Sequence, residues 1–147
     1  MRKNVHKSGL SGLALFALAA CSDNFNTADA SNNAAVVAGE PLYQKYCASC
    51  HGKNLEGQAN WKTTKMDGTL PAPPHDDSGH TWHHPDKLNF NYTKNGGAAN
   101  APKGFKSGMP PFKESMTDSE IWATLSFIKS RWSLKAQARQ ARMNKTP

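Results

Sequence analysis

The stretch Cys47-Ala48-Ser49-Cys50-His51 places two thiols and an imidazole on five consecutive residues. On a helical turn, positions three apart lie on one face, so both thiols would point the same way. The imidazole follows directly, and the third cysteine, Cys21, lies in an N-terminal segment of different character. We therefore expect these five residues to form one chemical site that organises the fold.

The spacing C-x-x-C-H is that of the attachment sequence of c-type haem, in which the thiols bond to two vinyl groups and the histidine binds iron. A thioredoxin-like redox pair would lie near an alternating strand–helix pattern, which the sequence lacks. A structural zinc site needs two further ligands at metal spacing. A disulfide between Cys47 and Cys50 would leave His51 without a role. The sequence therefore predicts one covalent haem c, held by Cys47, Cys50 and His51.

The composition fits a small domain that needs such a cofactor. The chain has 147 residues, of which 37% are hydrophobic, with 11 Gly and 9 Pro, so much of it should be loop. A small, loop-rich core gains buried apolar surface from a large cofactor. The same composition disfavours a multi-pass membrane protein, a coiled coil and a collagen-like chain.

The net charge of +7 is concentrated at the two ends of the chain. Three basic residues and no acidic one lie in the first 20 residues, and six basic residues with no acidic one follow from Lys129 onward. The remaining residues, 21–128, have a net charge of −2. Because a nucleic-acid-binding body carries a basic face, we expect no nucleic-acid partner.

The N-terminus is typical of an export signal. Residues 1–7 are basic, and residues 10–20 form an apolar run too short for a permanent membrane span. The ending Leu18-Ala19-Ala20-Cys21 resembles the lipobox of bacterial lipoproteins, in which the cysteine becomes the mature N-terminus and carries lipid. An ordinary secretory signal with a chance cysteine is the alternative. We expect a lipoprotein signal over 1–20 and a lipid anchor on Cys21, at the periplasmic face of a membrane.

The residue after Cys21 is Ser22 and not Asp, and in lipoproteins of enteric-type bacteria this favours sorting to the outer membrane.

Composition divides the rest of the chain into three parts. Residues 21–38 are rich in Asn, Ala, Ser and Asp and are predicted to be a flexible tether. The folded domain is expected over 39–134, and residues 135–147 are predicted to be a frayed basic tail.

Three segments together resemble the class I cytochromes c. Residues 39–52 are similar to the family's first helix, residues 107–112 to its distal loop, and residues 116–132 to its C-terminal helix. The resemblance covers residues 39–134 and is strongest to mono-haem cytochromes that accompany copper-handling systems. It implies a small all-α, loop-rich fold in which the N- and C-terminal helices cross around one covalently bound haem.

Residue patterns support these helices independently. A single apolar stripe runs along the last helix, formed by Ile121, Leu125, Ile128 and Trp132. Thr117 with Glu120 three residues later predicts a capping box that starts this helix. A third helix is expected to begin near Pro85 and to end at the glycines of residues 95–97. The resemblance implies that the first and last helices cross at a small residue.

For this crossing, the expected contact is between Gly39 and either Phe127 or Ile128.

The resemblance also implies that Met109, in the distal loop, is the sixth iron ligand. Gly108 and the prolines that follow Met109 can hold its thioether in place. The other methionines that survive signal removal are less suitable by position: Met66 among polar residues, Met116 at a helix start and Met143 in the tail. Met109 as an ordinary core residue remains the alternative.

The resemblance further implies contacts around the haem. A proline carbonyl in residues 70–75 should accept a hydrogen bond from the ring nitrogen of His51, and Pro73 and Pro74 are both candidates. Trp82 is expected either to donate its indole N–H to a haem propionate or simply to pack.

The segment from His75 to His84 departs from the minimal family pattern. With Asp86 it holds four histidines and three carboxylates within 12 residues, and such side chains can bind copper or zinc. The alternative is that these residues are solvated, cap the third helix and bond to propionates.

A His/Met pair closes the sixth iron position, which favours electron transfer over catalysis. The function expected is therefore that of a membrane-anchored electron carrier and not an enzyme. Its expected partners are a redox donor and acceptor, with a copper protein or an oxidase as candidates. Lysines that flank the two ligands would steer it toward an acidic surface, namely Lys53, Lys103, Lys106 and Lys113. Two alternatives are a haem-based sensor with a labile Met109 and a copper-binding accessory protein that uses the histidine cluster.

Overall fold

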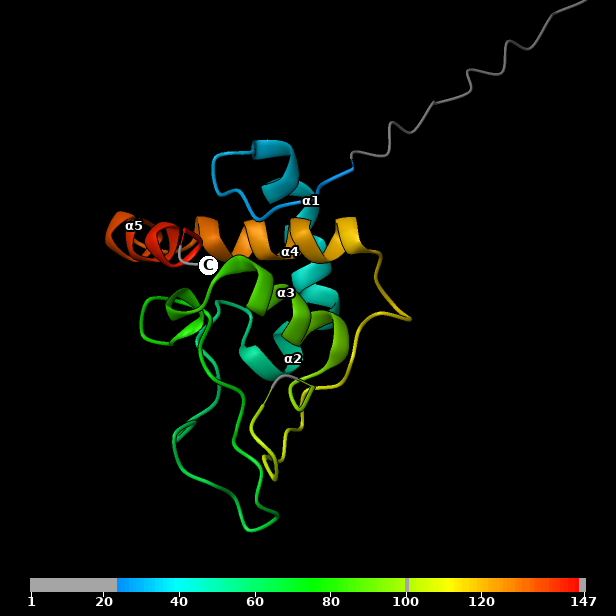
Figure 1. Cartoon of the computed structure of the whole chain (residues 1–147), viewed down its shortest axis with the longest axis vertical. Coiled ribbons are helices and arrows are strands. Elements are labelled where there is room, and N and C mark those ends of the chain that lie inside the picture. Colours follow the sequence, from blue (N-terminus) through cyan, green and yellow to red (C-terminus); the bar gives the residue numbers. More distant parts are fainter. Residues whose placement is uncertain (1–23, 100, 146–147) are drawn as a thin grey trace, which may run out of the picture.

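A computed structural model describes residues 24–99 and 101–145 (Figure 1). The predicted signal peptide over 1–20 and the lipidation site Cys21 lie outside these residues. The described part is all-α, as the sequence predicts, and holds no strand apart from one isolated bridge between Thr69 and Lys106. Its elements are α1 (Asn33–Tyr46), α2 (Ala48–His51), the 3₁₀ turn η1 (Thr81–His83), α3 (Asp86–Asn95), α4 (Asp118–Ser130) and α5 (Leu134–Met143).

The fold is built on the crossing of α1 and α4, which pack against each other more extensively than any other two helices (Figure 1). They approach closely because Gly39 has no side chain: a Cβ there would overlap the carbonyl oxygen of Ala123. The predicted crossing at Gly39 is correct, but its partners are Ala123 and Thr124, not Phe127 or Ile128. Phe127 lies one turn further along and packs on Tyr43, at 5.4 Å between ring centroids.

Local sequence signals set the ends of α3 and α4. The predicted capping box is confirmed: Thr117 Oγ1 accepts from the Glu120 N–H, and the Glu120 carboxylate accepts from the Thr117 N–H. α3 starts after Pro85 and ends at Gly96, whose φ of +87° disfavours residues with a side chain. Both ends of α3 agree with the sequence prediction.

The prediction of a flexible tether over 21–38 is wrong for the described residues. α1 begins at Asn33, and the Asn32 side chain caps it by accepting from Ala35 N at 3.2 Å. The preceding residues are fastened to α4 because the backbone N–H of Phe25 and that of Asp29 donate to serine hydroxyls on that helix. The composition indicated a tether because the segment has few large apolar residues. The segment is instead held by hydrogen bonds to α4 and by the burial of small alanines.

The predicted frayed tail also differs from the structure. Residues 134–143 form α5, which Ser133 caps by accepting from the backbone N–H of Ala136 at 3.3 Å. Gln140 is fully buried, and its Nε2 donates to the carbonyl of His84 at 3.2 Å. α5 therefore packs on η1 and the His84 that follows it, with Ala136 and Gln140 buried and its basic residues exposed. Within the described residues, no helix has the length and apolar character that a membrane crossing requires.

A long loop between α2 and η1 extends below the helices (Figure 1). Within it, Gln58 N donates to the Ala72 carbonyl at 2.9 Å, and a Cβ on Gly57 would overlap Pro74. These contacts bring the prolines of this loop back to α2, where the C-x-x-C-H residues lie.

Candidate haem site

The C-x-x-C-H residues lie at the junction of α1 and α2. Cys47 ends α1 and donates its backbone N–H to Tyr43 at 2.9 Å, while its own carbonyl accepts from His51 N at 2.9 Å. Both Cys47 and Cys50 are free thiols, with Cys47 half-buried and Cys50 exposed. Burial, followed by the nearby Cys50, raises the pKa of the Cys47 thiol to about 12. The Cys47 thiol is therefore protonated at neutral pH.

His51 is buried and its ring is held in one orientation. Its Nδ1 lies 2.8 Å from the Pro73 carbonyl oxygen, which can accept only a hydrogen bond, so Nδ1 carries the proton. Nε2 is then the nitrogen with a free lone pair for a metal. Burial lowers the pKa of His51, although its hydrogen bond to Pro73 acts in the opposite direction. The ring is therefore neutral, which is the form that binds iron.

Of the two candidate prolines, Pro73 supplies the carbonyl, and Pro74 holds the segment in place. A Cβ on Gly57 or on Gly79 would overlap backbone atoms of Pro74. The close approach of Gly57 and Gly79 thus holds the two prolines in place, and the Pro73 carbonyl keeps its orientation toward His51.

Met109 lies in a loop that is fastened to the C-terminal end of α3. The Met109 carbonyl accepts from Gly97 N at 3.1 Å, and its N–H donates to Ser107 Oγ at 3.1 Å. Further along, Phe112 N donates to the Thr93 carbonyl at 3.2 Å. Met109 is partly buried, whereas Met66 is fully exposed, Met143 is exposed and Met116 belongs to the core. Met109 therefore combines a fixed backbone with partial exposure of the residue.

Trp82 packs against neighbouring side chains, which is one of the two alternatives expected from the sequence. Its indole N–H donates to the Asp77 carbonyl at 3.3 Å, and its ring lies against His83. Arg139 of α5 covers the ring at 5.2 Å from its centroid. The packing expected for Trp82 is therefore observed, and a bond from Trp82 to a propionate stays a prediction.

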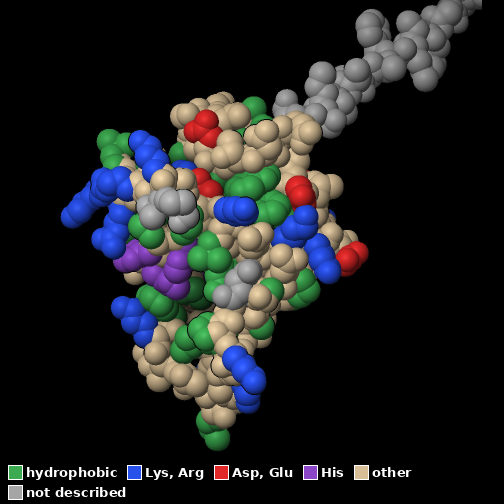
Figure 2. Space-filling model, in the orientation of Figure 1, with side chains coloured by type: hydrophobic (Ala, Val, Ile, Leu, Met, Phe, Trp, Pro, Cys, Tyr) green, Lys and Arg blue, Asp and Glu red, His purple; other side chains and the backbone are tan. Residues whose placement is uncertain are grey.

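The histidine cluster is divided among aromatic partners. His75 stacks on His51, His80 stacks on Trp61 and His83 packs on Trp82. Figure 2 shows histidines gathered beside Lys and Arg side chains on one face. Among residues 24–99 and 101–145, no group of three or more His, Cys, Asp or Glu side chains could hold a metal ion. The described residues thus bring together no such group in the histidine segment, and a second metal site there stays a prediction.

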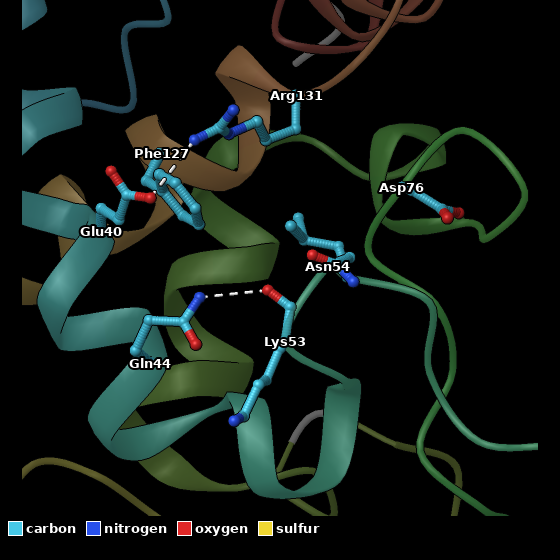
Figure 3. Close-up of a pocket in the computed structure, with 8 residues that line it drawn as sticks. Glu40, Gln44, Lys53, Asn54, Asp76, Phe127 and Arg131 are labelled. Atoms are coloured by element: carbon cyan, nitrogen blue, oxygen red, sulfur yellow. Dashed lines mark hydrogen bonds and ion pairs between the residues drawn. The ribbon is translucent and has the colours of Figure 1, made fainter.

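Two cavities lie elsewhere on the surface of the described part. One, of about 270 Å³, has mixed charges and is drawn in Figure 3, lined by Glu40, Gln44, Lys53, Asn54, Leu55, Asp76, Phe127 and Arg131. The other, of about 370 Å³, lies between Phe25 and the helices α1 and α4. Neither is lined by Cys47, Cys50, His51 or Met109, so neither belongs to the site above.

A sequence profile described as cytochrome c matches residues 36–132, which is most of the chain. The chain belongs to the cytochrome c family. Its structure is similar to the crystal structure of cytochrome cL from the marine methylotrophic bacterium Methylophaga aminisulfidivorans, with a TM-score of 0.52 and 22% identity over 80% of this chain and 69% of that one. At this identity the likeness concerns the fold alone. No curated protein matches the sequence.

This cytochrome c thus binds one covalent haem c, and its family supports a role in electron transport. The residues present fit the group: two free thiols three positions apart, and a buried neutral histidine with one nitrogen available. The sequence did not reveal that Trp132 donates its indole N–H to the His75 carbonyl at 2.7 Å. Its apolar spacing predicted only that it faces the core.

Proposed function

We propose that this cytochrome c is an outer-sphere electron carrier whose haem is bonded to Cys47 and Cys50, with His51 and Met109 as axial ligands. Bound haem c supplies an iron that exchanges one electron between its ferric and ferrous states. The observation that carries the proposal is the His51 ring, fixed through Nδ1 to the Pro73 carbonyl at 2.8 Å. That bond leaves the lone pair of Nε2 available, so His51 would hold the iron through Nε2 and would be a more basic ligand.

The fastening of the distal loop supports a permanent sixth ligand. Hydrogen bonds from Gly97 N to the Met109 carbonyl and from Phe112 N to the Thr93 carbonyl hold the loop, at Met109 and beyond it, to the C-terminal end of α3 and the residues that follow. A thioether opposite a histidine favours ferrous iron and closes the position that oxygen or a substrate would need. We therefore propose a carrier and no enzymatic reaction. A haem-based sensor with a labile Met109 is the alternative, and it requires this loop to open.

Replacement of Met109 by alanine tests the ligand assignment. The variant should have a lower reduction potential, because the thioether that stabilises ferrous iron is lost. Its ferrous form should also bind carbon monoxide readily. Met66→Ala is the matched control, since Met66 is fully exposed, and it should leave the potential unchanged. An unchanged potential in Met109→Ala would show that another residue is the sixth ligand.

We propose that the redox donor and acceptor dock through acidic surfaces, with a copper protein or an oxidase as candidates. Exposed lysines in the segments that flank the two ligands support this, namely Lys53, Lys103, Lys106 and Lys113. Electrostatic steering makes the second-order rate of electron transfer fall as salt is raised. A rate with the physiological acceptor that stays flat between low and high ionic strength would reject this proposal.

We also propose that Cys21 carries lipid and anchors the domain at the periplasmic face of a membrane, with the outer membrane favoured. The support is the sequence itself: a basic start, an apolar run over 10–20 and a lipobox-like ending at Cys21. Cys21→Ala should move the protein from the membrane fraction to the soluble periplasmic fraction with an unchanged haem spectrum. Retention in the membrane fraction would contradict the lipid anchor.

A further inference from the structure

The ring of His75 lies flat on the ring of His51. The two centroids are 3.9 Å apart and the planes are inclined by 22°. His75 follows the proline pair directly, so one short segment contacts His51 in two ways. Pro73 holds the edge of the ring through Nδ1, and His75 covers its face.

His75 is itself fixed by contacts from several parts of the fold. Its N–H donates to the Leu55 carbonyl and its carbonyl accepts from the Trp132 indole, each at 2.7 Å. Its ring Nδ1 lies 2.7 Å from Thr81 Oγ1, and the edge of Tyr43 packs against the ring at 6.3 Å. Because these contacts fix the His75 ring, its stacking contact can in turn fix the orientation of the His51 ring.

Simple packing does not explain an imidazole at this position. His75 is partly buried, and withdrawing a polar ring from water costs free energy unless the ring is hydrogen-bonded, whereas an apolar side chain would fill the space without that cost. Here the ring keeps a partner in Thr81, which is itself buried and whose carbonyl accepts from Asn89 Nδ2 at 3.1 Å. The chain thus maintains a polar ring with its own hydrogen-bond network against His51.

We propose that His75 is a positioning residue for the proximal ligand: its stacked ring limits rotation of His51 about the direction from Nε2 to iron, and its polarity lowers the reduction potential. The proposal rests on the proposed function, because it takes His51 as an axial ligand. Polar surroundings favour the more highly charged ferric state, since the shell around a metal site controls its dielectric and hence its potential.

Three variants of the full, haem-loaded protein separate the two effects. His75→Leu removes both the stack and the polarity, His75→Phe keeps a flat ring but loses the bond to Thr81, and Thr81→Val removes only that bond. His83→Leu is the matched control, because His83 packs on Trp82 and not on His51. The readouts are the midpoint potential and the g-value anisotropy of the low-spin ferric haem, which responds to the orientation of axial ligand rings.

His75→Leu should change the g-value anisotropy and favour ferrous iron by about threefold, which is ~28 mV at 59 mV per tenfold for one electron. His75→Phe should also raise the potential but keep the wild-type g values, Thr81→Val should raise it in the same direction, and His83→Leu should change neither readout. Wild-type values of both readouts in His75→Leu would overturn the proposal.

If His75→Leu does not fold, an unchanged potential in both His75→Phe and Thr81→Val would overturn the claim about polarity. The ligand assignment is checked separately with His51→Ala. If this variant keeps the wild-type low-spin spectrum, the proposed function fails, whatever the effect of His75.

Discussion

Replacing Gly39 by alanine puts one methyl group into the crossing of α1 and α4. A Cβ at this position would overlap the Ala123 carbonyl oxygen and lie 2.9 Å from Thr124 N. Both are backbone atoms within α4, so no side-chain rotation can relieve the overlap. The two helices must move apart, and the contact between Tyr43 and Phe127 one turn away must loosen with them.

Two terms of opposite sign set the size of the effect. Alanine is favoured over glycine in a helix interior by ~1 kcal/mol. Overpacking costs ~1–3 kcal/mol and more where backbone must shift. Because the clash is with backbone at the main helix contact, we expect the cost to prevail and the free energy of unfolding to fall by ~2 kcal/mol. In a domain of this size that lowers the Tm by about 8 °C.

Urea unfolding of the haem-loaded protein, followed by far-UV circular dichroism, measures this change. Val37→Ala is the control on the same helix, since Val37 is 62% exposed, and should alter the free energy of unfolding by less than ~0.5 kcal/mol. A Gly39→Ala protein as stable as the wild type, or more stable, would refute the close approach of the two helices at this residue.

Two further predictions concern local hydrogen bonds. Thr117→Ala removes the acceptor for the Glu120 N–H at the start of α4 and should lower the free energy of unfolding in urea by ~1 kcal/mol; no loss would mean that the cap is not formed. Hydrogen bonds from the Ser31 hydroxyl and from its backbone N–H lower the pKa of Asp29. That contribution to stability is present above the ordinary pKa of Asp and is lost as pH falls through the lowered value. Asp29→Asn should therefore flatten the acid limb of the stability–pH curve, and an unaltered limb would contradict this assignment.

The features that the sequence predicted correctly depend on residues close together in the chain. C-x-x-C-H, the capping box at Thr117 and the glycine stop at Gly96 each need only a few neighbours to act. The local structure that each of these motifs forms depends little on the surrounding fold. The helical class and the haem could be predicted for this reason.

The features it missed depend on contacts between distant segments. The backbone of residues 24–32 is held by hydroxyls of α4, and α5 is held by a buried Gln140, and neither contact has a local signature. The histidine segment suggested a metal site by composition, but in the described residues its rings pack on aromatic partners and on one another, and no group of three or more His, Cys, Asp or Glu side chains forms. The stack of His75 on His51 joins residues 24 positions apart. It could not be predicted from the sequence because it forms only when the loop between α2 and η1 folds back onto α2.

The visible spectrum of the purified full-length protein, recorded with and without reductant and then under carbon monoxide at neutral pH, tests the central claim most directly. A carrier with His51 and Met109 on its iron should show a six-coordinate, low-spin haem in both oxidation states and no change when carbon monoxide is added. A prompt shift of the ferrous spectrum under carbon monoxide would show a labile sixth position and contradict the carrier assignment.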